Sequence, residues 1–180
     1  PDGSFFHMLS ALPVTTVQSE PNSFFSIVLL IALVLVNAFF AASEIAIITL
    51  NDNKIKKMAE DGDKRAVKVL KLTSNSSRFL ATIQVGITLS GFLTSASASQ
   101  SFAGKLAQAL SFLPFSQNLR YGASTVIITL LLSYFSLVFG ELVPKKIAMQ
   151  RAEELSFKFI GVLNATSAIF KPFISFLTFS

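Results

Sequence analysis

The feature that most constrains this chain is an apolar run from Phe24 to about Thr49 that contains no lysine or arginine. At about 1.5 Å per residue, a helix of this length crosses the roughly 30 Å of hydrocarbon in a bilayer. The composition points the same way, with 52% hydrophobic and 14% charged residues. A soluble domain carries about 25% charged residues. We therefore expect an integral membrane protein.

Two further apolar segments predict two more spans, so the expected spans are about 24–49, 79–99 and 122–140. The fold class we expect is an all-α membrane protein with three transmembrane helices. The middle span is only weakly apolar, and its small residues at four-residue spacing favour close helix packing. Residues 1–23 read as a tail outside the cytoplasm. Residues 100–121 read as an outer loop with a short amphipathic helix that Pro114 ends.

The basic residues predict the orientation. Residues 51–78 carry eight, residues 145–171 carry five, and the predicted outer loop carries two. Because cytoplasmic loops are enriched in lysine and arginine, we expect the N-terminus outside and the C-terminus in the cytoplasm. Residues 51–78 predict two short amphipathic helices against the inner leaflet, broken at 60–63. Residues 145–170 predict an interfacial helix that Lys171-Pro172 ends. Since topology explains the basic charge, we expect no nucleic-acid partner.

Polar residues inside the first span are the first functional signal. Asn37, Ser43 and Glu44 lie among residues that otherwise read as lipid-facing, and a carboxylate in hydrocarbon costs several kcal/mol. Glu44 and Glu141 are the two carboxylates near the ends of spans. We expect no lysine or arginine within a predicted span, so a cation pathway would meet no fixed positive competitor there.

Depth along the spans suggests one shared site. Ser43, Gly86 and Glu141 all fall in the predicted inner half of the membrane. Gly140 and Pro144 flank Glu141, and both weaken helix continuation. Hydroxyls, a carboxylate and backbone carbonyls freed by a broken helix would supply the hard oxygen ligands that Mg²⁺ requires.

Each candidate has a structural alternative. The Ser43 hydroxyl could bond back to its own helix, Glu141 could be an interfacial carboxylate next to Lys145, and Gly86 and Gly91 could serve close packing. Asn37 and Glu44 share a helix face and could form interhelical hydrogen bonds. Cysteine is absent and His7 is the single histidine, which excludes thiolate chemistry and a multi-histidine metal site. No nucleophile–base pair appears, so we expect no enzyme.

Three motifs carry a family resemblance. They are Asn37-Ala38-Phe39-Phe40-Ala41-Ala42-Ser43-Glu44, Gln84-Val85-Gly86-Ile87-Thr88-Leu89, and Phe139-Gly140-Glu141-Leu142-Val143-Pro144-Lys145. In this order and spacing the chain resembles the transmembrane domain of the CorC/cyclin M magnesium transporters, often labelled hemolysin-like in bacteria. The resemblance covers about residues 24–175.

The resemblance implies a homodimer with three spans per subunit and a dehydrated magnesium ion in an inward-facing cavity. It implies that Ser43, Glu141 and carbonyls around Gly86 bind the ion. It also implies sodium as the counter-ion and cytoplasmic CBS domains after residue 180. Many members carry a ligand asparagine where this chain has Gly91, with Thr88 and Ser90 as the nearby oxygens. A hydroxyl or water would then take its place, or the site would be weaker or take another cation.

We therefore expect a multi-pass protein of the cell membrane, in the bacterial inner membrane, that exports magnesium by alternating access. The alternative is a non-transporting membrane regulator or scaffold that senses a cation or partners a channel. A pore-forming lytic protein is disfavoured, because three short spans show no lumen-lining pattern.

Overall fold

The computed structural model describes residues 23–179, with side chains described for 24–172, and this part of the chain contains helices and no strand. The tail predicted before the first span lies outside the described residues, apart from its last position. Three helical stretches are long and apolar enough to cross a membrane: Phe24–Ile48, Ser76–Phe112 and Gln117–Gln150. The predicted number of spans is confirmed, and the chain is a membrane protein.

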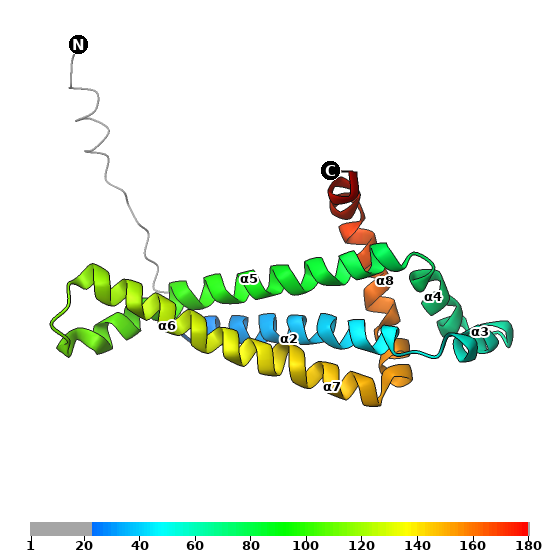
Figure 1. The fold of residues 1–180 in the computed structure, drawn as a ribbon, viewed down its shortest axis with the longest axis horizontal. Helices are drawn as coiled ribbons and strands as arrows, with labels where there is room; N and C mark the ends of the chain where they lie inside the picture. Colours follow the sequence, from blue (N-terminus) through cyan, green and yellow to red (C-terminus); the bar gives the residue numbers. More distant parts are fainter. Residues whose placement is uncertain (1–22, 180) are drawn as a thin grey trace, which may run out of the picture.

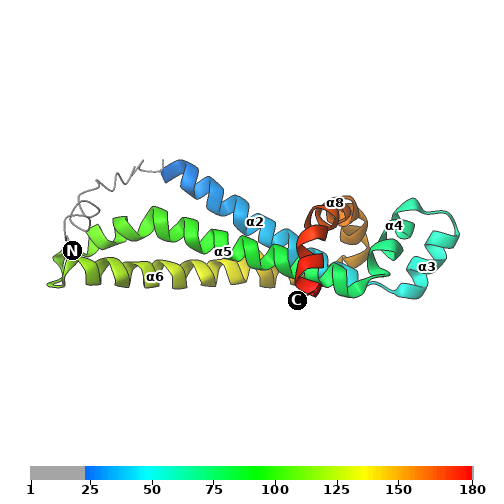
Figure 2. The same cartoon turned by 90° about the horizontal axis from the view of Figure 1, so that it is seen from above.

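The three long helices lie side by side as one elongated bundle (Figures 1 and 2). Helix α2 (Ser23–Ile48) packs against α5 (Ser76–Ala109), and α5 packs against α6 (Gln117–Leu137). A π-helical turn, η2 (Val138–Leu142), joins α6 to α7 (Val143–Gln150), and both η2 and α7 contact α2. A 3₁₀ turn, η1 (Leu110–Phe112), closes the hairpin between α5 and α6 at the far end.

The remaining helices gather at the other end of the bundle. Helices α3 (Asp52–Glu60) and α4 (Lys64–Thr73) extend beyond it, and α8 (Ala152–Phe179) crosses the long helices at a steep angle (Figure 1). Both predicted basic segments therefore begin at the same end. Which side of the membrane this end faces, and whether these helices touch lipid, stay predictions.

The ends of the short helices follow from their sequence. Asn51 caps α3 by accepting a hydrogen bond from the Lys54 backbone N–H, and Asp63 caps α4 by accepting from Arg65 and Ala66. Gly62 between them has a φ of +93°, a conformation that glycine adopts without steric cost. Two separate helices with a break at 61–63 match the prediction for this segment.

The main core lies where these helices meet the bundle. Buried side chains from α2, α3, α4, α5 and α8 form one cluster, which includes Phe40, Ile55, Val69, Ile83 and Leu163. On α5 the inward stripe is made of small residues at four-residue spacing: Thr82, Gly86, Ser90, Thr94 and Ala98. Their size lets α2 approach α5 closely, as predicted for Gly86, whereas Gly91, also predicted to serve packing, lies outside this stripe.

Three predicted boundaries are wrong. Residues 100–109, predicted as an outer loop with a separate short amphipathic helix, are helical but form one continuous helix with α5, where Ala103 is buried. The third span does not close at 140–146 but passes through η2 into α7. The helix predicted at 145–170 is divided at Arg151, and α8 runs through Pro172 instead of ending there. Proline removes one helical hydrogen bond, and α8 continues in spite of this loss.

Candidate functional site

The backbone of the third long helix, Gln117–Gln150, changes register at the motif that contains Gly140, Glu141 and Pro144. In an α-helix the Gly140 carbonyl would accept a hydrogen bond from residue 144, but Pro144 has no N–H. The chain forms the π turn η2 here instead, and the Val143 N–H bonds to the carbonyl of Val138, five residues back. π-Helical turns inside α-helices occur frequently at functional sites.

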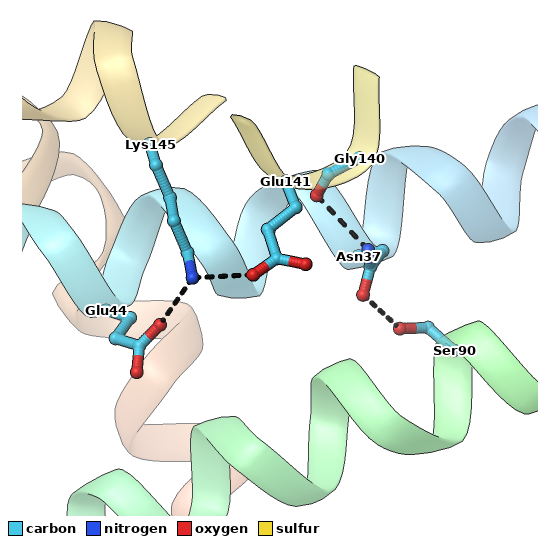
Figure 3. A network of polar contacts seen from close by, with 6 residues as sticks. All are labelled: Asn37, Glu44, Ser90, Gly140, Glu141 and Lys145. Carbon is cyan, nitrogen blue, oxygen red and sulfur yellow. Dashed lines mark hydrogen bonds and ion pairs between the residues drawn. The ribbon is translucent and has the colours of Figure 1, made fainter. Parts of the chain in front are cut away.

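The side chain of Asn37 binds the carbonyl that can receive no α-helical hydrogen bond from Pro144. Its Nδ2 donates to the Gly140 oxygen at 3.2 Å, and its Oδ1 accepts from the Ser90 hydroxyl at 3.0 Å (Figure 3). All three residues are buried. Asn37 therefore joins α2, α5 and η2 through one amide, which is the interhelical role that the sequence left open for it.

Gly140 has no room for a side chain. A Cβ atom at this position would lie 2.9 Å from Asn37 Nδ2 and 3.4 Å from the Ser136 hydroxyl. Gly86 is equally crowded, since a Cβ there would lie 2.7 Å from the ring of Phe40. Both glycines therefore let α2 contact its neighbours closely around Asn37.

An open groove of about 360 Å³ runs beside this network between α5 and the third long helix. Its polar lining comprises Asn37, Thr88, Ser95, Ser133, Ser136 and Glu141. Gly91 also lines it, and a Cβ there would meet nothing within 4 Å. The groove thus offers hydroxyl, amide and carboxylate oxygens, with one carboxylate among its lining residues.

Lys145 holds the two motif carboxylates together. Its Nζ lies 2.8 Å from Glu141 Oε1 and 3.3 Å from Glu44 Oε2 (Figure 3). Each of the three side chains is between 23% and 33% exposed, so solvent screens these ion pairs only in part. Lys145 lies beyond the predicted third span, but the helix continues past Glu141 and places this lysine one turn later. The carboxylates therefore do have a positive competitor, and Glu141 lies next to Lys145 as in the alternative weighed for it.

The comparison with protein families decides the identity of the chain. Residues 28–180 match the family described as the cyclin M transmembrane N-terminal domain. The chain belongs to this family. The predicted resemblance is therefore confirmed.

Relatives of this cyclin M domain come from several bacteria. The UPF0053 protein sll0260 of Synechocystis is 32% identical over 145 residues, covering 81% of this chain and 32% of that protein. The UPF0053 protein YhdT of Bacillus subtilis is 29% identical, covering 83% of this chain and 32% of that protein. The polyamine export protein of Haemophilus influenzae is 27% identical, covering 85% of this chain and 35% of that protein. The cyclin M domain thus spans about a third of the length of these curated relatives.

The structure brings some of the predicted site residues of the cyclin M domain together. Glu141, Thr88, Gly91 and Asn37 line the groove. Ser90 lies behind it, bonded to Asn37. Pro144 has no N–H to donate, and the backbone beside Glu141 forms the π turn.

Three other candidates do not line the groove. The buried Ser43 hydroxyl donates to the Phe39 carbonyl at 2.7 Å, the back-bond weighed as its alternative. The Gly86 carbonyl lies 2.7 Å from the Ser90 hydroxyl, and its Cα packs on Phe40. Glu44 pairs with Lys145. In this arrangement Ser43, Gly86 and Glu141 do not converge on one oxygen cage, and their role as ion ligands stays a prediction.

Sequence reasoning missed Ser133, Ser136 and Lys145 as site residues. A signal existed for the two serines, since they lie three residues apart and Ser136 precedes Glu141 by five residues in a stretch that is mostly apolar. The lysine lies four residues after Glu141, the spacing at which side chains on one helix face meet. Within the part of the chain that the structure describes, no group of three or more His, Cys, Asp or Glu residues is placed to hold a metal.

Proposed function

We propose that this chain is the membrane domain of a cation transporter that exports magnesium by alternating access. The observation that carries the proposal is the position of Glu141. Its carboxylate lies on a π-helical turn and lines an open groove whose other polar groups are hydroxyls and one amide. Mg²⁺ binds through one or two carboxylates plus neutral oxygens and keeps several waters. The groove supplies this donor set, and Gly91 leaves space for the waters.

The bundle architecture supports a transport role. The groove lies beside a broken helix at the interface of two spans, where transporters place sites for ions. In the proposal the end with α3, α4 and α8 faces the cytoplasm, because the basic segments begin there. Sodium is the proposed counter-ion, and the CBS domains proposed to follow residue 180 would lie on the same side.

The exposed face of the third long helix supports a homodimer in the membrane. In its most apolar 18 residues only 6% are buried, compared with 28% and 33% in the corresponding stretches of the other two spans. Its exposed residues include Leu130, Leu131, Tyr134 and Phe135. A second copy or lipid would cover such a face, and the family resemblance favours the second copy for part of it.

A flux assay tests the function. The purified chain, reconstituted in liposomes, is expected to move Mg²⁺ along its gradient, as reported by a trapped magnesium dye. Glu141→Gln removes the groove carboxylate and should abolish the flux. Glu154→Gln is the matched control, because this α8 carboxylate is 68% exposed and outside the groove lining. Equal flux in the two variants would exclude Glu141 as the site. Folded protein without flux would favour the regulator or scaffold alternative.

A polyamine is the second candidate cargo. Two relatives carry the name polyamine export protein, one from Haemophilus influenzae and one from Salmonella typhimurium. The structure offers a specific reason to consider it, since the primary ammonium of Lys145 is already bound between Glu44 and Glu141. The same liposomes loaded with labelled spermidine separate the candidates. Spermidine flux without Mg²⁺ flux would favour the polyamine.

A further inference from the structure

The ammonium of Lys145 occupies one oxygen of the groove carboxylate. Its Nζ lies 2.8 Å from Glu141 Oε1, while the other Glu141 oxygen points away from the lysine toward the Asn37 side (Figure 3). The lysine lies on α7 four residues beyond Glu141, directly after Pro144. A cation entering the groove therefore meets a carboxylate that is already paired with a positive charge.

The covalent connection makes this lysine a strong competitor. A group tethered close to its partner acts at an effective concentration in the millimolar range or above. Lys145 is tethered by one helical turn, so it returns to Glu141 whenever a cargo ion loosens. Cations that bind the groove weakly would not displace it.

Glu44 gives the lysine a second partner. It lies on α2, 3.3 Å from the same Nζ atom. When a cation takes Glu141, Lys145 can keep its pairing with Glu44, so no partly buried charge is left alone. An unpaired buried charge would be costly, and the second carboxylate removes that cost.

We propose that Lys145 is a tethered competitor that sets the affinity of the groove and drives release of the cargo. Loading of the cation moves the ammonium from Glu141 to Glu44 alone, and its return to Glu141 expels the cation. This inference rests on the proposed function. Lys145 is a positioning residue here, since it acts on the cargo through Glu141.

Two variants test the competition. Lys145→Gln removes the competitor, and Lys146→Gln removes the same charge from the next, exposed position on α7. Because two opposite charges in contact attract each other appreciably near a protein surface, Mg²⁺ binding to Lys145→Gln should be at least about tenfold tighter by calorimetry. Lys146→Gln should stay within about twofold of the original chain, since an exposed charge is largely screened.

Flux in liposomes gives a second readout that a merely structural role would not reproduce. Lys145→Gln should saturate at a lower Mg²⁺ concentration yet reach a lower maximal rate, because release has lost its driving group. Lys145→Arg keeps the charge and should restore part of that rate. Weaker Mg²⁺ binding by Lys145→Gln, or equal changes in Lys145→Gln and Lys146→Gln, would overturn the inference.

A measurement on the unaltered chain removes dependence on the folding of the variants. An amine-reactive reagent labels lysines, and mass spectrometry compares Lys145 with Lys146 as internal control. Mg²⁺ should raise labelling of Lys145 alone, because it breaks one of its two ion pairs, and Glu141→Gln should abolish that response. Mg²⁺ binding with unchanged Lys145 labelling would overturn the inference and leave the proposed function standing. Absence of Mg²⁺ binding in the original chain and in Lys145→Gln would overturn both.

Discussion

The Asn37 amide and the Gly140 carbonyl, 103 residues apart, form a hydrogen bond of 3.2 Å that replaces the one Pro144 cannot supply. The break in the third helix thus becomes a contact with the first. The same amide accepts from Ser90 on α5, so the three spans meet at one side chain. Glu141 follows Gly140 directly, and its position therefore depends on this network.

Removal of the Asn37 amide should destabilise the bundle. Asn37→Leu keeps a similar volume but leaves the Gly140 carbonyl without this donor, while the Ser90 hydroxyl keeps its contact with the Gly86 carbonyl. A buried polar group that loses its partner costs about 1–3 kcal/mol. The thermal unfolding midpoint in detergent should fall accordingly. Asn37→Asp keeps the acceptor for Ser90 and loses the donor to Gly140, so its unfolding midpoint should also fall. An unchanged midpoint in Asn37→Leu would show that the network does not stabilise the fold.

Gly86 and Gly91, both on α5, should respond in opposite ways to a methyl group. Gly86→Ala places Cβ 2.7 Å from the Phe40 ring, and overpacking of this kind costs about 1–3 kcal/mol. Gly91→Ala meets nothing within 4 Å, so it should be neutral or should stabilise the helix by about 0.5–1 kcal/mol. Thermal unfolding of the two variants measures the difference. Phe40→Leu in the Gly86→Ala background should recover part of the loss, and a failure to do so would assign the loss to another contact.

The groove hydroxyls of Ser133 and Ser136 should matter for the ion and not for the fold. Ser133 and Ser136 line the groove, whereas Ser124 on the same helix has a buried hydroxyl without a hydrogen-bond partner among the described residues. Loss of a hydrogen bond or ligand contact to a charged group costs about 1.5–3 kcal/mol, or about tenfold or more in affinity. Calorimetry should show this weakening for Ser136→Ala and no change for Ser124→Ala. Equal affinities would place the ion elsewhere.

Asp63 should make the α4 cap sensitive to acid. The Arg65 backbone N–H donates to its carboxylate and the Arg65 side chain adds a charged contact, which holds the pKa of Asp63 below its ordinary value of 3.8. Because the pKa of Asp63 is lower in the folded chain than in the unfolded chain, the ionised carboxylate stabilises the fold at pH values above 3.8. This stabilisation is lost as the pH falls below 3.8 and through the pKa of the folded chain. Helix content measured against pH should fall for the original chain in that range.

Asp63→Asn is the control for this titration, since asparagine also caps helices but does not ionise. Its helix content should lack the acid step that belongs to α4. Arg65 also stacks on Phe157 of α8, with its guanidinium carbon 5.0 Å from the ring centroid, so loss of the cap is expected to loosen the contact between α4 and α8 as well. An identical acid step in Asp63→Asn would assign the titration to another carboxylate.

The sequence predicted the spans and the motifs because their signals are local. Apolar length determines a membrane helix, and the break between α3 and α4 follows from a capping aspartate and a glycine. Asn37, Gly140 and Pro144 were each identified as unusual in a helix. Their relation to one another was not, since a proline removes a donor wherever it stands and the sequence does not say which side chain replaces it.

Boundaries and partners depended on packing. Residues 100–109 continue α5 because Ala103 is buried there, and α8 passes Pro172 in spite of the lost hydrogen bond. By itself the sequence determined a three-span membrane domain of the cyclin M family with a carboxylate motif in its third span. Only the tertiary structure decided that Lys145 pairs with Glu44 on α2 as well as with Glu141, which also lines the groove. The physical reason is that a charge finds its partner across helices, at a distance set by helix packing and by the register of the π turn.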